Sequence, residues 1–62
     1  GHTDEALTYV LLKEEGPDHN KSFEVSAMLG GQEIGRGIGR TKKSAEQRAA
    51  YRGILTIRKP QE

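Results

Sequence analysis

The sequence contains no cysteine and no tryptophan, and its aromatic residues are limited to two tyrosines and one phenylalanine. Without cysteine, neither a disulfide nor a thiolate metal site can supplement the core, which fits a reducing compartment. The two histidines, His2 and His19, are far apart in the sequence and lack the spacing of metal ligands. There is no signal-peptide pattern, and no apolar run approaches the roughly 18 residues of a membrane span. These absences favour a soluble cytoplasmic domain that has no membrane partner and no cofactor of its own.

The chain has 62 residues and a formal net charge of +1. A chain of this size forms one small domain with a thin core, because it buries only about 60% of its unfolded surface. The net charge alone is a weak argument for a polyanionic partner. However, most of the acidic residues lie within positions 4–24, whereas positions 36–59 are rich in Lys and Arg and contain Glu46 as their only acid. A local basic field therefore exists inside a nearly neutral molecule.

Alternating apolar residues and turn signals predict three strands in the first two thirds of the chain. In the second strand, Phe23, Val25 and Ala27 share one face. Gly30-Gly31 is typical of a two-residue hairpin, because glycine adopts positive φ without strain. The expected segments are the strand Leu7–Glu15, the loop Gly16–Lys21, and the strands Ser22–Leu29 and Gln32–Gly39.

The side chains of these strands are expected to alternate between two faces. In the first strand, Tyr9 and Leu11 face one side, and Val10 and Leu12 face the other. In the third strand, Ile34 and Ile38 are expected to point inward. The glycines of that strand leave room for another part of the molecule to approach closely; they are Gly35, Gly37 and Gly39.

A helix is predicted after the third strand, with Thr41 as its N-cap and its end at about Arg58, before Pro60. Small residues near its start allow it to lie close to the sheet, while larger residues fill the far end. The sequence thus predicts an α+β fold in which a three-stranded antiparallel sheet carries a C-terminal helix on one face, in the order β-β-β-α. The expected apolar stripe of the helix comprises Ala45, Ala49, Ala50, Gly53, Ile54 and Ile57.

The start of this helix is a candidate binding site. Lys42 and Lys43 fall in its first turn, where backbone N–H groups lack intrahelical partners and the helix dipole is positive. Lysines at this end oppose the usual preference for acids, so folding stability does not explain them. A phosphate group would be well placed to bind there.

Two separated motifs, together with the rest of the chain from Leu7 to Ile57, resemble the double-stranded-RNA-binding domain, in the form found at the C-terminus of bacterial ribonuclease III. This resemblance implies an α-β-β-β-α fold that recognises duplex RNA by shape. In that fold the first helix and the loop between the first two strands enter minor grooves, and the start of the last helix meets phosphates across the major groove. The segments that carry the resemblance are Tyr9–Glu15, Gly16-Pro17-Asp18-His19, Phe23-Glu24-Val25, Gly35–Gln47 and Ala49-Ala50.

The resemblance implies a role for seven residues of this sequence. Pro17 and His19 correspond to the residues that enter a minor groove. Many members of the family have a third lysine at the position of Glu46, although the ribonuclease III branch usually has Ala-Glu-Gln there. The residues expected to contact phosphates are Arg40, Thr41, Lys42 and Lys43, with Gln47 assisting one turn further on.

The sequence departs from the family pattern at its N-terminus, where only Gly1–Ala6 precede the first strand and the family's first helix is missing. We expect residues 1–6 to be a tag remnant or linker, residues 7–59 to be the RNA-binding domain, and residues 60–62 to be a tail. The absence of that helix would expose apolar surface on the sheet and the last helix. A homodimer or a domain swap would be one way to cover it.

The expected function is to grip double-stranded RNA for a ribonuclease III, without catalysis by this chain. Glu14 and Glu15 are adjacent on a strand and point to opposite faces, so they cannot share a metal ion. In the family, the Mg²⁺ site belongs to a separate nuclease domain. The alternative is a module that uses the same fold to dimerise. Salt dependence separates the two, because phosphate binding weakens steeply with salt and an apolar interface does not.

Overall fold

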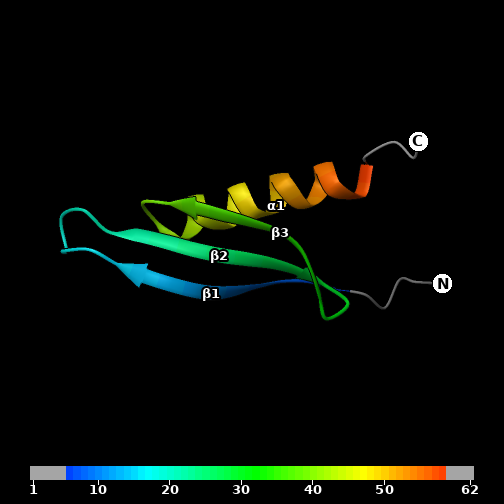
Figure 1. Ribbon diagram of the computed structural model, residues 1–62, viewed down its shortest axis with the longest axis horizontal. Coiled ribbons are helices and arrows are strands. Elements are labelled where there is room, and N and C mark those ends of the chain that lie inside the picture. Colours follow the sequence, from blue (N-terminus) through cyan, green and yellow to red (C-terminus); the bar gives the residue numbers. More distant parts are fainter. Residues whose placement is uncertain (1–5, 59–62) are drawn as a thin grey trace.

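The computed structural model describes residues 6–58, and these form a three-stranded antiparallel sheet with one helix on its face (Figure 1). The order and the bounds of the strands agree with the prediction, and the α+β fold is confirmed. Expectations for Gly1–Glu5 and Lys59–Glu62, including the stop at Pro60, lie outside the described residues. The elements are β1 (Leu7–Glu15), β2 (Ser22–Leu29), β3 (Gln32–Gly39) and α1 (Lys42–Arg58).

Glycine conformation shapes both strand connections. Gly30 and Gly31 have φ values of 60° and 82°, as a two-residue hairpin with a primed turn requires. This confirms the predicted turn between β2 and β3. Gly16 ends β1 with a φ of 100°, and a Cβ atom at this position would collide with the backbone oxygen of Asn20. Glycine is therefore needed at the start of the β1–β2 loop.

The core consists of a few small side chains between β2 and α1. Val25 and Ala27 of β2 are buried against Ala45 and Ala49 of α1, and Phe23 packs beside them. The prediction that Phe23, Val25 and Ala27 share one face of β2 is thus confirmed, and that face is the inner one. Because these side chains are small, the helix and the sheet must approach each other closely to exclude water.

The close approach is made possible by the glycines of β3. A Cβ atom at Gly35 would lie 2.5 Å from the backbone oxygen of Ala49, and a Cβ atom at Gly37 would collide with the backbone of α1. On the helix, Gly53 leaves space for the side chain of Ile34. The element that approaches the β3 glycines is therefore α1 itself, and its backbone lies directly on that strand.

The inward orientation predicted for Ile38 is wrong, whereas that of Ile34 is confirmed. The pairing of β2 with β3 runs from Ala27 opposite Gly35 to Met28 opposite Glu33, so Ile34 is an extra, bulged residue. The bulge reverses the alternation and places Ile34 on the same side as the glycines. Ile38 lies opposite Glu24 on the other side of the sheet and is 54% exposed.

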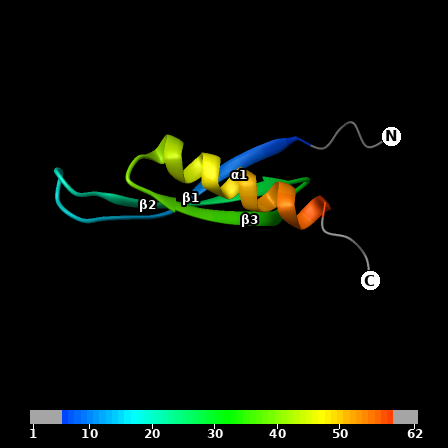
Figure 2. The ribbon, with the colours of Figure 1, turned by 90° about the horizontal axis from the view of Figure 1, so that it is seen from above.

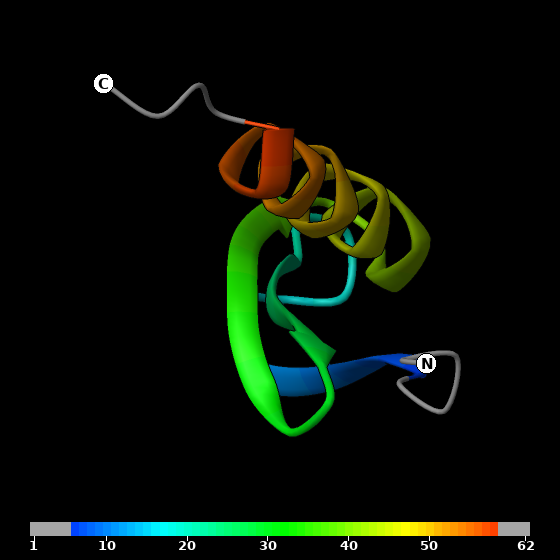
Figure 3. The same ribbon diagram turned by 90° about the vertical axis from the view of Figure 1, so that its right-hand side faces the viewer.

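The larger residues of α1 do not fill the far end of the core as expected. Ile54 and Ile57 are 49% and 57% exposed, because α1 packs over β3 and part of β2 and leaves β1 uncovered (Figure 3). On the same side of the sheet, Tyr9 and Leu11 of β1 are also exposed. We call these four residues the uncovered apolar face. Helix α1, the only helix within residues 6–58, is not long and apolar enough to cross a membrane.

Candidate nucleic-acid interface

The start of α1 is fixed by a reciprocal cap. The side-chain oxygen of Thr41 accepts a hydrogen bond from the backbone N–H of Ser44 at 3.0 Å, and the Ser44 hydroxyl oxygen accepts one from the N–H of Thr41 at 3.3 Å. The N–H of Ala45 donates to the carbonyl of Thr41 at 3.0 Å. Thr41 is thus the N-cap that the sequence predicted, and its side chain holds the first turn in place.

The cap leaves the next two residues open to a ligand. Lys42 and Lys43 are exposed, and their backbone N–H groups have no acceptor among residues 6–58. The first turn of α1 contains no acidic residue. None of the ion pairs between described residues involves Arg40, Lys42 or Lys43. Two ammonium groups, one guanidinium group and unpaired N–H donors therefore meet at the positive end of the helix dipole.

The β1–β2 loop forms a defined turn next to this site. The backbone N–H of Asn20 donates to the carbonyl of Pro17 at 2.9 Å, and Pro17 and His19 are exposed on the turn. At the base of the loop, Lys21 forms a 2.5 Å ion pair with Glu14. The hydrogen bond and the charge of Lys21 lower the pKa of the Glu14 carboxyl, and the charge of Lys42 contributes to the same shift. The base of the loop is therefore held by a paired carboxylate and ammonium group.

The loop and the helix start lie at the same end of the molecule (Figures 1 and 2). Gln47 is exposed one turn further along α1, and Glu46 beside it is half-buried. The structure thus brings the two segments predicted from the sequence to one end of the fold. Whether each side chain contacts RNA stays a prediction.

Within residues 6–58, the cation Arg36 on the sheet face opposite α1 is paired with carboxylates, unlike the lysines at the helix start. Arg36 donates a 2.8 Å hydrogen bond to Glu33 and lies 3.7 Å from Glu24. Ser26, which is 2% exposed, donates to the same oxygen of Glu33 at 2.6 Å. The bonds from Arg36 and then Ser26 lower the pKa of Glu33, and Glu33 raises the pKa of Arg36. We call these four residues the outer-face network, in which each charge already has a partner.

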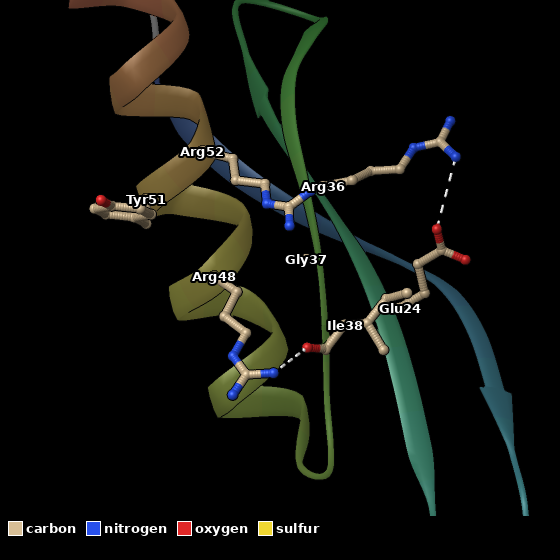
Figure 4. Close-up of a pocket in the computed structure, with 7 residues that line it drawn as sticks. All are labelled: Glu24, Arg36, Gly37, Ile38, Arg48, Tyr51 and Arg52. Atoms are coloured by element: carbon tan, nitrogen blue, oxygen red, sulfur yellow. Dashed lines mark hydrogen bonds and ion pairs between the residues drawn. The ribbon is translucent and has the colours of Figure 1, made fainter.

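Sequence reasoning did not identify a role for Arg48. Arg48 donates a 2.8 Å hydrogen bond to the backbone oxygen of Ile38, at the free edge of β3 (Figure 4). The four-residue spacing of Arg48 and Arg52 is the one signal that could have indicated a shared side of the helix. Which side chains of α1 lie beside β3 depends on how the helix packs on the sheet, and the spacing of the arginines in the sequence does not show this.

The three-stranded sheet and its helix present, at the helix N-terminus, cations that have no partner among residues 6–58, and this arrangement suits the binding of a phosphate backbone. The family model described as "Double-stranded RNA binding motif" matches residues 2–57. The chain therefore belongs to the double-stranded RNA binding motif family, and it is a domain that binds double-stranded RNA.

Curated relatives include several proteins named "Ribonuclease 3". The protein from Geobacillus thermodenitrificans (strain NG80-2) is 52% identical over 52 residues, which cover 84% of this chain and 21% of the relative. The protein from Anoxybacillus flavithermus (strain DSM 21510 / WK1) is 46% identical over 56 residues, which cover 90% of this chain and 24% of the relative. The chain is thus similar to about a fifth of the length of these relatives.

Proposed function

We propose that the chain grips duplex RNA through the β1–β2 loop and the start of α1, as the substrate-holding module of a bacterial ribonuclease III. The observation that carries this proposal is the set of cations and N–H groups at the helix start that have no partner within the described part of the chain. The exposed turn that contains Pro17 and His19 lies at the same end of the fold (Figure 1). One face of a duplex can therefore reach them together.

The proposed contacts follow the shape of A-form RNA. Its major groove is deep and narrow, so side chains read phosphates across it rather than bases, while its shallow minor groove displays 2′-hydroxyl groups. Pro17 and His19 enter the minor groove, and Gln47 assists the contacts at the helix start. The phosphates are held by Arg40, Lys42 and Lys43, and by the hydroxyl of Thr41, whose hydrogen is not used in the bond from Ser44.

In this proposal the chain binds and does not cleave. It needs no cofactor for binding, and Mg²⁺ serves a nuclease domain that belongs to the longer protein. The relatives named "Ribonuclease 3" support this division, because the chain matches only about a fifth of their length. A cytoplasmic location is proposed with it, in keeping with a sequence that contains no cysteine.

The test compares a duplex RNA of about 16 base pairs with the same sequence as DNA, at two salt concentrations. We expect salt-dependent binding of RNA and not of DNA. Replacing both Lys42 and Lys43 with Ala should weaken binding to all duplex sequences and reduce the salt slope by about one unit per lost phosphate contact. Lys13→Ala is the matched control, because Lys13 is paired with Glu15 at 3.2 Å on β1. Equal losses in both variants would contradict the proposed site.

We also propose that a second copy of the chain packs on the uncovered apolar face. Four large side chains on β1 and α1 are exposed there, and such surfaces favour association. Sedimentation at high micromolar concentration should give a dimer whose stability does not fall with salt. A monomer under these conditions would rule out the second copy, and RNA binding would be unaffected by that result.

A further inference from the structure

A groove lies between α1 and the outer edge of β3 (Figure 4). Its volume is about 580 Å³. Arg36 in the groove is paired with Glu24, but among the described residues neither Arg48 nor Arg52 forms an ion pair. The groove is therefore positively charged. Its lining includes Glu24, Arg36, Ile38, Arg48, Tyr51 and Arg52.

The floor of the groove is an open strand edge. In the sheet order β1-β2-β3, β3 has a strand neighbour on one side only within residues 6–58. Because Arg48 donates to the backbone oxygen of Ile38, that oxygen must point away from β2. Hydrogen-bonding direction alternates along an antiparallel strand, so the N–H and C=O groups of Arg36 point outward as well. Such an edge can accept another strand.

We propose that this groove binds an acidic peptide segment, which adds to β3 as a fourth strand. Main-chain hydrogen bonds to the N–H and C=O groups of Arg36 and to the N–H of Ile38 would hold the peptide backbone, while the oxygen of Ile38 keeps its bond from Arg48. Alternate side chains of the peptide then point to the α1 side, where carboxylates meet the guanidinium groups of Arg48 and Arg52. The remaining side chains point to the other side, where Ile38 is 54% exposed and favours an apolar neighbour.

The composition of the groove favours a peptide over a nucleic acid. The strand edge offers alternating main-chain donors and acceptors, which phosphate groups cannot match because they carry acceptors only, and the exposed side chain of Ile38 offers a phosphate no donor. An extended peptide can use the arginines, the apolar side chains and the strand edge at once. This binding is distinct from the proposed grip on RNA and does not depend on it.

The first experiment titrates a capped eight-residue peptide of alternating Glu and Val into the chain and follows backbone amide NMR signals. We expect the signals of Arg36, Ile38 and Arg48 to shift, and those of Lys42 and Lys43 to stay unchanged. Two further peptides carry N-methyl groups at every Glu or at every Val. Strand addition predicts that one of the two fails to bind, because alternate N–H groups face β3. Unchanged binding of both, or shifts confined to the helix start, would overturn the proposal.

Charge is tested by substitution. Arg52→Gln should weaken the Glu/Val peptide about tenfold, the size of one charge-assisted hydrogen bond, and leave the affinity for duplex RNA unchanged. Lys13→Gln is the matched control and should leave peptide binding unchanged. A peptide with Lys in place of Glu should not bind. Equal binding of the Lys peptide, or displacement of the Glu/Val peptide by duplex RNA, would show that the groove is not a site for acidic peptides.

Discussion

The start of α1 and the outer-face network use the same kinds of charged residues in opposite ways. Arg36 is bonded to Glu33, which also accepts from Ser26, so the charges on the outer face satisfy each other. At the helix start, Lys42 and Lys43 have no carboxylate partner among the described residues and lie where the helix dipole disfavours them. The first arrangement supports the fold, and the second keeps its charge available for an anion.

The substitution with the largest expected effect unfolds the domain, so that neither region keeps its arrangement of charges. Gly37→Val places a branched side chain where even a Cβ atom would collide with the backbone of α1. The helix cannot then dock on β3, and we expect a loss of about 3 kcal/mol or more, which rivals the whole stability of so small a domain. Circular dichroism should show an unfolded chain, and RNA binding should be lost with it. The control is Gly31→Asn. It introduces a residue that tolerates the positive φ of 82°, at a position where a Cβ atom would meet open space, and this variant should remain folded.

A charge reversal at the helix start should separate binding from stability. Replacing both Lys42 and Lys43 with Glu removes two phosphate contacts and adds repulsion, so we expect duplex RNA affinity to fall by about a hundredfold or more. The same change places acids at the positive end of the helix dipole, which should stabilise the fold by about 0.3–1 kcal/mol for each residue. Binding assays and thermal unfolding of the same sample check both effects. A variant that loses stability as well would mean that the lysines support the fold.

Most of the fold could be predicted from local signals. The strand bounds, the Gly30-Gly31 turn and the cap at Thr41 each depend on residues that are neighbours in sequence. The orientation of Ile38 could not be predicted, because the bulge at Ile34 reverses the alternation and is set by the pairing of β3 with β2. The exposure of Ile57 also escaped prediction, since it depends on which strands α1 covers.

In the candidate site too, features set by neighbouring residues could be predicted, whereas features set by the packing of distant elements could not. Lysines in the first turn of a helix could be recognised from their spacing after the glycine-rich strand, and the structure confirms that Thr41 caps that turn. The position of the loop base at the same end of the fold as the helix start was not visible in the sequence, because Glu14 and Lys42 are far apart along the chain. It emerges only when the sheet and α1 are packed, which brings the β1–β2 loop and the helix start to one end of the molecule (Figure 1).

The smallest expected effect compares Glu33 of the outer-face network with Glu14, which lies at the base of the β1–β2 loop, at the same end of the molecule as the helix start (Figure 1). Glu14 and Glu33 both have a lowered pKa in the folded state, so the stability they contribute is present above about pH 4.5 and is lost as the pH falls through their folded values. Glu14→Gln and Glu33→Gln should each reduce this acid-dependent loss of stability, as measured by thermal unfolding.

At neutral pH, Glu14→Gln should also tighten duplex RNA binding a few-fold, because it removes a negative charge near Lys42 and frees Lys21. Glu33→Gln should leave RNA binding unchanged, since its carboxylate belongs to the outer-face network. Equal effects of the two substitutions on RNA affinity would mean that the two regions are not electrostatically separate.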